Sequence, residues 1–185
     1  MEIINLITDL FKYNTGYLVK HLSAMDKTLL FVRPDNKSNP IIWILGHIVA
    51  SRGSLIEMLG EEPQIRELGY YFNAGSKPLS NPSGYPNIDE IMGQLGKLST
   101  KLTRLIKDGG EALLNRQVWG QYDSIGKHIV SGYIHEAYHV GQISYLMNLV
   151  SKSNSAGYRF KLAGKKVNSP GKILIDSLKA ALTVK

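Results

Sequence analysis

The 185-residue chain contains no cysteine. This absence excludes disulfide bonds, thiolate metal sites, redox chemistry of the CxxC type and a cysteine nucleophile. Any bound metal ion must therefore be held by histidine, by carboxylate or by water.

The sequence also lacks an apolar run of membrane-spanning length, which would need about 20 residues. The first residues, Met1 to Leu6, carry an acid at Glu2, where a secretory signal would carry basic residues. We therefore expect a cytoplasmic protein with no membrane partner. The length suits one domain that buries its own core.

Acidic residues are scarce near the C-terminus. Residues 1–150 carry 14 Lys plus Arg against 14 Asp plus Glu, whereas residues 151–185 carry 8 against Asp176 alone. A basic tail can meet nucleic acid, but no nucleic-acid-binding motif accompanies it, and a solvated face explains the charge more simply. We expect no nucleic-acid partner and predict a domain over 1–150 with a basic extension over 151–185.

Four segments repeat apolar residues at intervals of three and four, which is typical of core-facing helices. They cover approximately residues 2–25, 40–59, 87–108 and 124–150. A connection over residues 60–86, rich in glycine and proline, separates the second from the third, and connections of this length usually cover a site. The pattern predicts an all-α fold, a four-helix bundle with a long crossover between the second and third helices.

Local signals set the expected helix ends. Asn39 and Pro40 suit the start of the second helix, Asn87 with Glu90 forms a capping box for the third, and Gly109-Gly110 should end the third. In the first helix, Tyr13 and Asn14 lie on or beside the expected inward stripe.

The C-terminal extension is predicted to form a small hairpin within residues 157–167 and a short helix after Ser169-Pro170. The apolar stripe of that helix should dock on the bundle or on a second subunit; it consists of Leu174, Ile175, Leu178 and Leu182. From this stripe and from the prevalence of symmetric dimers, we expect a homodimer.

Two histidines lie four residues apart in His135-Glu-Ala-Tyr-His139. This spacing puts both imidazoles on one helix face, within reach of one metal ion. The segment matches the HExxH pattern of zinc peptidases, whose third ligand comes from downstream. No glutamate follows Glu136, no histidine follows His139, and Tyr145 stands where the extended motif needs its third histidine. A peptidase is therefore disfavoured.

A third ligand from upstream fits better. His47 lies in the apolar stretch Ile41–Ala50 of the second helix, which can face the fourth helix in a bundle. A lone histidine there is more often a hydrogen-bonded core residue, but three imidazoles would leave coordination positions open, as at catalytic sites. His128 lies about 10 Å along the axis from His135 and can join the site only if the helix bends. His21 should meet solvent or the carbonyls at the end of the first helix.

Imidazole ligands suit zinc, nickel, iron and copper alike. We expect a divalent transition metal, with zinc or nickel favoured and iron as the alternative.

Three motifs together resemble those of the DinB-like (DinB/YfiT) superfamily of metal-dependent four-helix-bundle enzymes, over about residues 1–150. They are Tyr13-Asn14, Trp43-Ile-Leu45-Gly-His47 and His135-Glu-Ala-Tyr-His139-Val-Gly141-Gln142. The resemblance implies that His47, His135 and His139 bind the metal and that the second and third helices are joined by a long connection. Many members have arginine where this chain has Val140, so an anion-binding role is not carried over to that position.

Relatives in that superfamily include S-transferases that use a small thiol such as bacillithiol, and a mycothiol-dependent isomerase. The resemblance thus implies a small-molecule substrate and a thiol activated by the metal, since a metal-bound thiol is deprotonated at neutral pH. Lacking cysteine, the chain would need an external thiol.

Two other functions stay open. One is metal-assisted hydrolysis with Glu136 as general base, although Glu136 lies about 100° around the helix from His135. Tyr13 and Asn14 are further candidates for catalytic residues, and together with Tyr138 and Gln142 they could orient the ligands. The other is a non-enzymatic bundle whose basic tail binds a partner.

Overall fold

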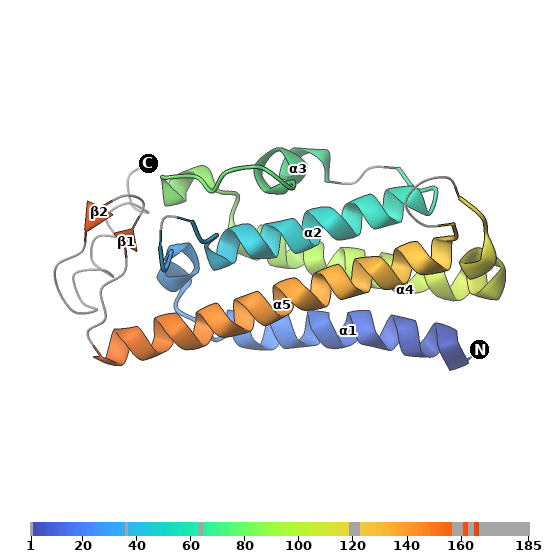
Figure 1. Ribbon diagram of the computed structural model, residues 1–185, viewed down its shortest axis with the longest axis horizontal. Helices are drawn as coiled ribbons and strands as arrows, with labels where there is room; N and C mark the ends of the chain where they lie inside the picture. The colour runs from blue at the N-terminus through green and yellow to red at the C-terminus, as the bar shows by residue number, and fades with distance from the viewer. Residues whose placement is uncertain are drawn as a thin grey trace.

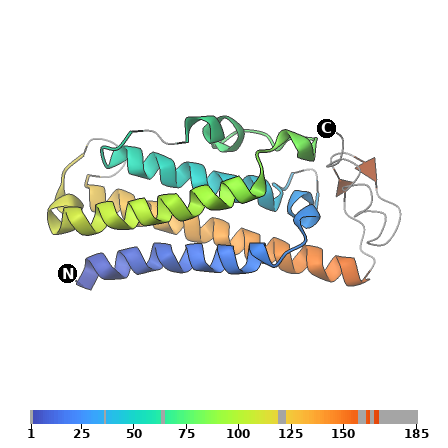
Figure 2. The same cartoon turned by 180° about the vertical axis from the view of Figure 1, so that it is seen from behind.

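The computed structural model describes residues 2–35, 37–62, 65–118, 123–156, 161–162 and 165–166. Four long helices form the predicted all-α bundle (Figures 1 and 2). They are α1 (Glu2–Ser23), α2 (Ile41–Met58), α4 (Ile88–Asn115) and α5 (Ile125–Ala156). In Figure 1, α1 and α5 run in one direction and α2 and α4 in the other. Because α2 and α4 are parallel, the chain between them must return along the whole bundle.

Helix α2 is the central element of the core. It packs against α5, α4 and α3 (Arg66–Phe72), and its residues from Ile41 to Ala50 are all buried. By length and composition α2 could cross a membrane, but 72% of it is buried inside the bundle. This burial explains why its sequence is apolar nearly all round.

The described part of the crossover between α2 and α4 contacts the outer side of α2, as Figure 1 shows for α3. It contains α3 and the short helix η2 (Pro82–Gly84). Phe72, at the end of α3, is fully buried, and its ring lies where a side chain at Gly46 would be, since a Cβ there would come within 2.5 Å. Gly46 therefore allows the crossover to reach the backbone of α2, one residue before His47.

The termini of several helices differ from the expected positions. Asn87 is the N-cap of α4, as predicted, but its side chain accepts a 2.9 Å hydrogen bond from the Asp89 backbone N–H and not from that of Glu90, the predicted capping-box partner. Gly110 has a φ of 56° and a ψ of −151°, which are not helical, so it interrupts α4 where an end was predicted. Glycine tolerates positive φ, and a second helical segment continues past this kink to Asn115. Helix α5 continues to Ala156, past the expected end near Val150.

One edge of the stripe of α1 that was predicted to face the core is exposed instead. Asn14 is buried, but Tyr13 is 71% exposed. Two apolar residues of the same helix, Ile3 and Leu6, are also 49% and 57% exposed. The apolar residues of α1 span more of its circumference than the core covers, so periodicity alone could not say which edge faces inward.

The short helix η1 (Lys27–Phe31) follows α1. In the extension, β1 (Lys161–Leu162) pairs antiparallel with β2 (Lys165–Lys166), in agreement with the predicted hairpin. The helix predicted after Ser169-Pro170 lies outside the described residues.

Candidate metal centre

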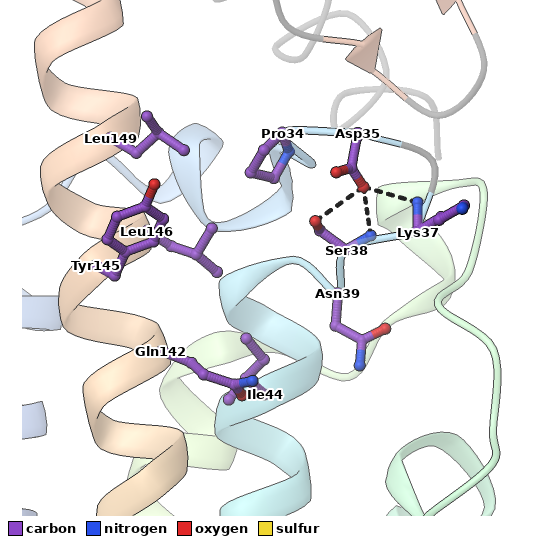
Figure 3. A pocket seen from close by; sticks show the side chains of 10 residues that line it. All are labelled: Pro34, Asp35, Lys37, Ser38, Asn39, Ile44, Gln142, Tyr145, Leu146 and Leu149. Carbon is purple, nitrogen blue, oxygen red and sulfur yellow. Dashed lines mark hydrogen bonds between the residues drawn. The ribbon is translucent and has the colours of Figure 1, made fainter.

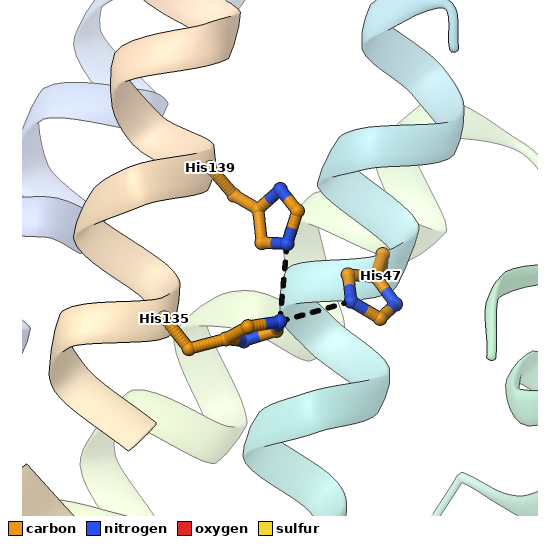
Figure 4. A group of neighbouring side chains, drawn as sticks. All are labelled: His47, His135 and His139. Carbon is orange, nitrogen blue, oxygen red and sulfur yellow. Dashed lines mark hydrogen bonds between the residues drawn. The ribbon is translucent and has the colours of Figure 1, made fainter. Parts of the chain in front are cut away.

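Three imidazoles from two helices converge between α2 and α5 (Figure 4). The Nε2 atom of His135 lies 3.3 Å from Nε2 of His47 and 3.1 Å from Nε2 of His139. Tetrahedral ligands at about 2.0–2.1 Å from a zinc ion would be about 3.3 Å apart. These two distances therefore fit a shared divalent ion, and the three ligand atoms, which all lie within 4.8 Å of one another, could bind one.

The other ring nitrogen of two histidines is already hydrogen-bonded. His47 Nδ1 donates to the Phe72 carbonyl at 2.6 Å, and His139 Nδ1 donates to Gln142 Oε1 at 2.8 Å. Each bond fixes the tautomer that leaves Nε2 with a free lone pair, and such partners orient metal-binding histidines in proteins. The crossover thus has a direct role, because Phe72 brings it to His47.

Further contacts support the hydrogen-bonded positions of His47 and Gln142. Trp43 stacks on His47 with ring centres 5.1 Å apart, and its Nε1 donates to Ser76 Oγ at 3.1 Å. Gln142 Nε2 donates to the Tyr138 hydroxyl at 3.0 Å. The crossover therefore positions His47, and other residues of α5 position His139.

The trio is open to solvent on one side. His47 and His139 are 7% and 9% exposed, whereas His135 is exposed. A cavity of about 400 Å³ lies one helical turn away, since Gln142 follows His139 on α5 and Ile44 precedes His47 on α2. Figure 3 shows it between α2, α5 and the loop before α2. Its walls are Pro34, Asp35, Lys37, Ser38, Asn39, Ile44, Gln142, Tyr145, Leu146 and Leu149.

Burial favours the neutral imidazoles that a metal requires. Desolvation, followed by the nearby His47, lowers the pKa of His135 below its ordinary 6.5, while Glu136 acts in the opposite direction. Desolvation also lowers the pKa of His139, against the raising effect of its hydrogen bond to Gln142. Both histidines therefore stay neutral to a lower pH than exposed histidines would.

The metal-free protein should lose stability in acid through these two residues. Their pKa values are lower in the folded than in the unfolded state, so their contribution is complete above pH 6.5 and falls as pH drops below it. We expect a melting temperature that is flat near pH 7–8 and declines below about 6.5. The double variant His135→Gln/His139→Gln should show a shallower decline. Equal pH dependence of the two proteins would contradict this expectation.

Glu136 does not join the histidines. It is 3% exposed, and it forms a buried ion pair with Arg52, which donates from Nε to Oε2 and from Nη2 to Oε1, both at 2.6 Å. Asn14 Nδ2 also donates to Oε1 at 3.0 Å. Both carboxylate oxygens are thus engaged in the core, which favours a structural role for Glu136 over that of a general base.

Tyr138 and Gln142, predicted to orient the ligands, lie beside the trio, because Gln142 bonds both to His139 and to Tyr138. Three other predicted residues are placed away from the trio. Asn14 contacts Glu136 in the core, Tyr13 faces solvent, and His128 is not a member of the metal-capable group. Sequence reasoning missed Arg52. Its signal was a lone arginine two residues after the apolar stretch Ile41–Ala50 of the second helix, since a buried charge needs a buried partner.

A family model described as the DinB superfamily matches residues 10–143, a segment that contains all three histidines. The chain belongs to the DinB superfamily. Among solved structures, this DinB-superfamily chain is similar to a conserved protein from Enterococcus faecalis, with a TM-score of 0.58 and 15% identity. The match covers 82% of this chain and 99% of that protein, and at this identity it shows a shared fold. No match was found among curated proteins.

Proposed function

We propose that this DinB-superfamily protein is a divalent-metal-dependent enzyme that transfers a small external thiol to an electrophilic small molecule in the cytoplasm. The observation that carries the proposal is the convergence of three Nε2 atoms beside an exposed His135. Structural zinc sites are closed by four protein ligands, whereas catalytic sites keep a position open. The metal-capable group in the described part of the chain has three members.

A zinc or nickel ion, or alternatively iron, would supply open coordination positions and lower the pKa of a bound thiol. The chain's own residues do the rest. His47, His135 and His139 would coordinate the ion through neutral imidazole nitrogens. Phe72 and Gln142 orient the rings of His47 and His139 by hydrogen bonds. The neighbouring cavity could receive the remainder of the thiol or of its acceptor.

In this transfer, the thiol sulfur forms a bond to an electrophilic carbon of the acceptor, and the bond from that carbon to its leaving group breaks. The thiol proton passes to solvent at the exposed side of His135. Because the chain has no cysteine, no protein thiol competes with the external one.

The buried ion pair of Glu136 favours thiol transfer over hydrolysis. Enzymes that activate a metal-bound water commonly use a carboxylate as general base, and the HExxH glutamate is the residue expected to do so. Here that carboxylate is bonded to Arg52 and Asn14. A coordinated thiol is deprotonated by the metal itself and needs no such base.

The proposal is tested with metal-loaded protein, a chlorodinitrobenzene-type electrophile and a panel of small thiols. We expect thioether formation that requires both thiol and metal, that is lost in His47→Ala and that survives in the control His21→Ala. Acceptor hydrolysis without thiol would favour the metal-dependent hydrolase. Absence of both reactions in protein shown to contain metal would favour a non-enzymatic bundle.

A further inference from the structure

Exposed hydrophobic side chains gather on one side of the bundle. Of the nine large hydrophobic side chains exposed in the described part of the chain, seven form two rows, one on α1 and one on α5. Within each row the residues are three, four or seven positions apart, so each row follows one face of its helix. The rows are Ile3, Leu6 and Tyr13 on α1, and Val130, Ile134, Tyr138 and Tyr145 on α5. We call them together the α1/α5 face.

The two rows belong to neighbouring helices. Helices α1 and α5 lie side by side and parallel (Figure 1). The Tyr17 hydroxyl donates to Ser144 Oγ at 2.7 Å, and the rings of Phe11 and Tyr133 meet edge to face at 5.6 Å. Through these two contacts α1 and α5 touch at two points along their length. The exposed rows on the two helices therefore form one continuous surface.

The α5 part of this surface has few charges, whereas the α1 part includes the exposed ion pair of Asp9 with Lys12. Between Lys127 and Lys152, Glu136 is the sole Asp, Glu, Lys or Arg in α5, and it is buried. About six turns of α5 therefore present no such charged side chain to solvent. A helix on the surface of a monomer normally places charged residues opposite its buried face, so this composition indicates a covered face.

The exposed area matches that of a stable interface. The seven side chains are 43% to 71% exposed. At about 200 Å² for a large side chain when fully exposed, they offer on the order of 800 Å². A standard interface takes about 800 Å² from each partner, whereas the largest apolar patch of a typical monomer is about 300–600 Å².

We propose that the α1/α5 face binds the same face of a second copy of the chain, forming a homodimer. Such a face can pack against itself across a two-fold axis, because the α5 row brings no like charges together and Asp9 in the α1 row is already paired with Lys12. The basic extension, with 8 Lys plus Arg among residues 151–185, is chemically less suited to cover it. Gly141 lies between the tyrosines of the α5 row, with open space where a side chain would be, and there a partner can approach closely.

The proposed interface borders the metal centre. The Tyr138 hydroxyl accepts a hydrogen bond from Gln142, which in turn holds His139. Tyr145 belongs to the face and also lines the cavity beside the trio. The second copy would therefore cover the outer side of residues that position a metal ligand.

The experiment is light scattering after size exclusion on the full chain and on Leu6→Glu and Ile134→Glu variants, alone and combined. Tyr70→Glu is the matched control, because Tyr70 is 83% exposed but lies on α3. We expect twice the 20.6 kDa chain mass for the wild type and for Tyr70→Glu. The double variant should have the single mass, with an unchanged helical circular dichroism spectrum because both side chains are exposed.

A wild type that stays monomeric at high micromolar concentration would overturn the proposal, as would a dimer that persists in the double variant. A Leu178→Glu variant tests the extension. If Leu178→Glu is monomeric while the Leu6→Glu/Ile134→Glu variant is still a dimer, the contact lies on the extension. None of these results depends on the proposed reaction, because the inference rests on the surface alone.

Discussion

Alanine at His47 or at His139 is expected to abolish metal binding. The two residues lie on different helices, yet their Nε2 atoms both lie within 3.3 Å of His135 Nε2. Even the loss of a hydrogen-bond partner of a ligand costs about 10–100-fold in metal affinity, so loss of a ligand should cost at least about 100-fold. Elemental analysis of protein purified without an affinity tag should find about one equivalent in the wild type and a trace in either variant.

Two further variants sharpen this test. His21→Ala should keep its metal, because His21 contacts Tyr17 at the end of α1 and is not part of the trio. Gln142→Ala should bind about 10–100-fold more weakly, because His139 loses the acceptor of its Nδ1–H. Retention of a full equivalent by His47→Ala would contradict a site shared between α2 and α5. A wild type that takes up neither zinc nor nickel would leave the histidines as packing residues.

The helices and the trio could be predicted because each rests on a local pattern. The spacing of apolar residues gave the four helices, and His135 and His139 share a face at any rotation of α5. His47 needed one further step, that the apolar second helix faces the fourth, and the structure confirms that α2 packs on α5.

Two kinds of feature could not be predicted from the sequence. One is the rotation of each helix about its axis, and the other is the pairing of residues far apart in the chain. Tyr13 and Asn14 are adjacent, yet one faces solvent and the other the core. The ion pair joins Arg52 to Glu136, residues 84 positions apart, and no local pattern pairs them. The acceptor for His47 is a backbone carbonyl of the crossover, which side-chain motifs do not reveal.

Replacing Arg52 alone with methionine is expected to destabilise the fold by about 3–5 kcal/mol. The paired side chains of Arg52 and Glu136 are 1% and 3% exposed. Arg52 also donates to Thr15 Oγ1 at 2.8 Å and to the Phe11 carbonyl at 3.2 Å, so it links α2 to α1 and α5. Without it, a carboxylate would stay buried with Asn14 as its remaining donor. Urea unfolding followed by circular dichroism measures the loss.

The double variant Arg52→Met/Glu136→Leu should recover much of this stability, because it removes both buried charges. Lys27→Ala is the surface comparison. It breaks the ion pair with Asp89, whose side chains are 59% and 69% exposed, and should cost less than about 1 kcal/mol. A double variant as unstable as the single one would show that packing around Arg52, not its charge, holds the helices.

The same pair decides the role of the HExxH glutamate. If Glu136 serves to join α5 to α2, Glu136→Gln should lower stability, because Arg52 loses its charged partner, and the remaining folded protein should bind metal and turn over thiol. If Glu136 is also a general base, the folded Glu136→Gln protein should bind metal and lose turnover. Measuring unfolding, metal content and activity on this one variant therefore separates a structural ion pair from a catalytic carboxylate.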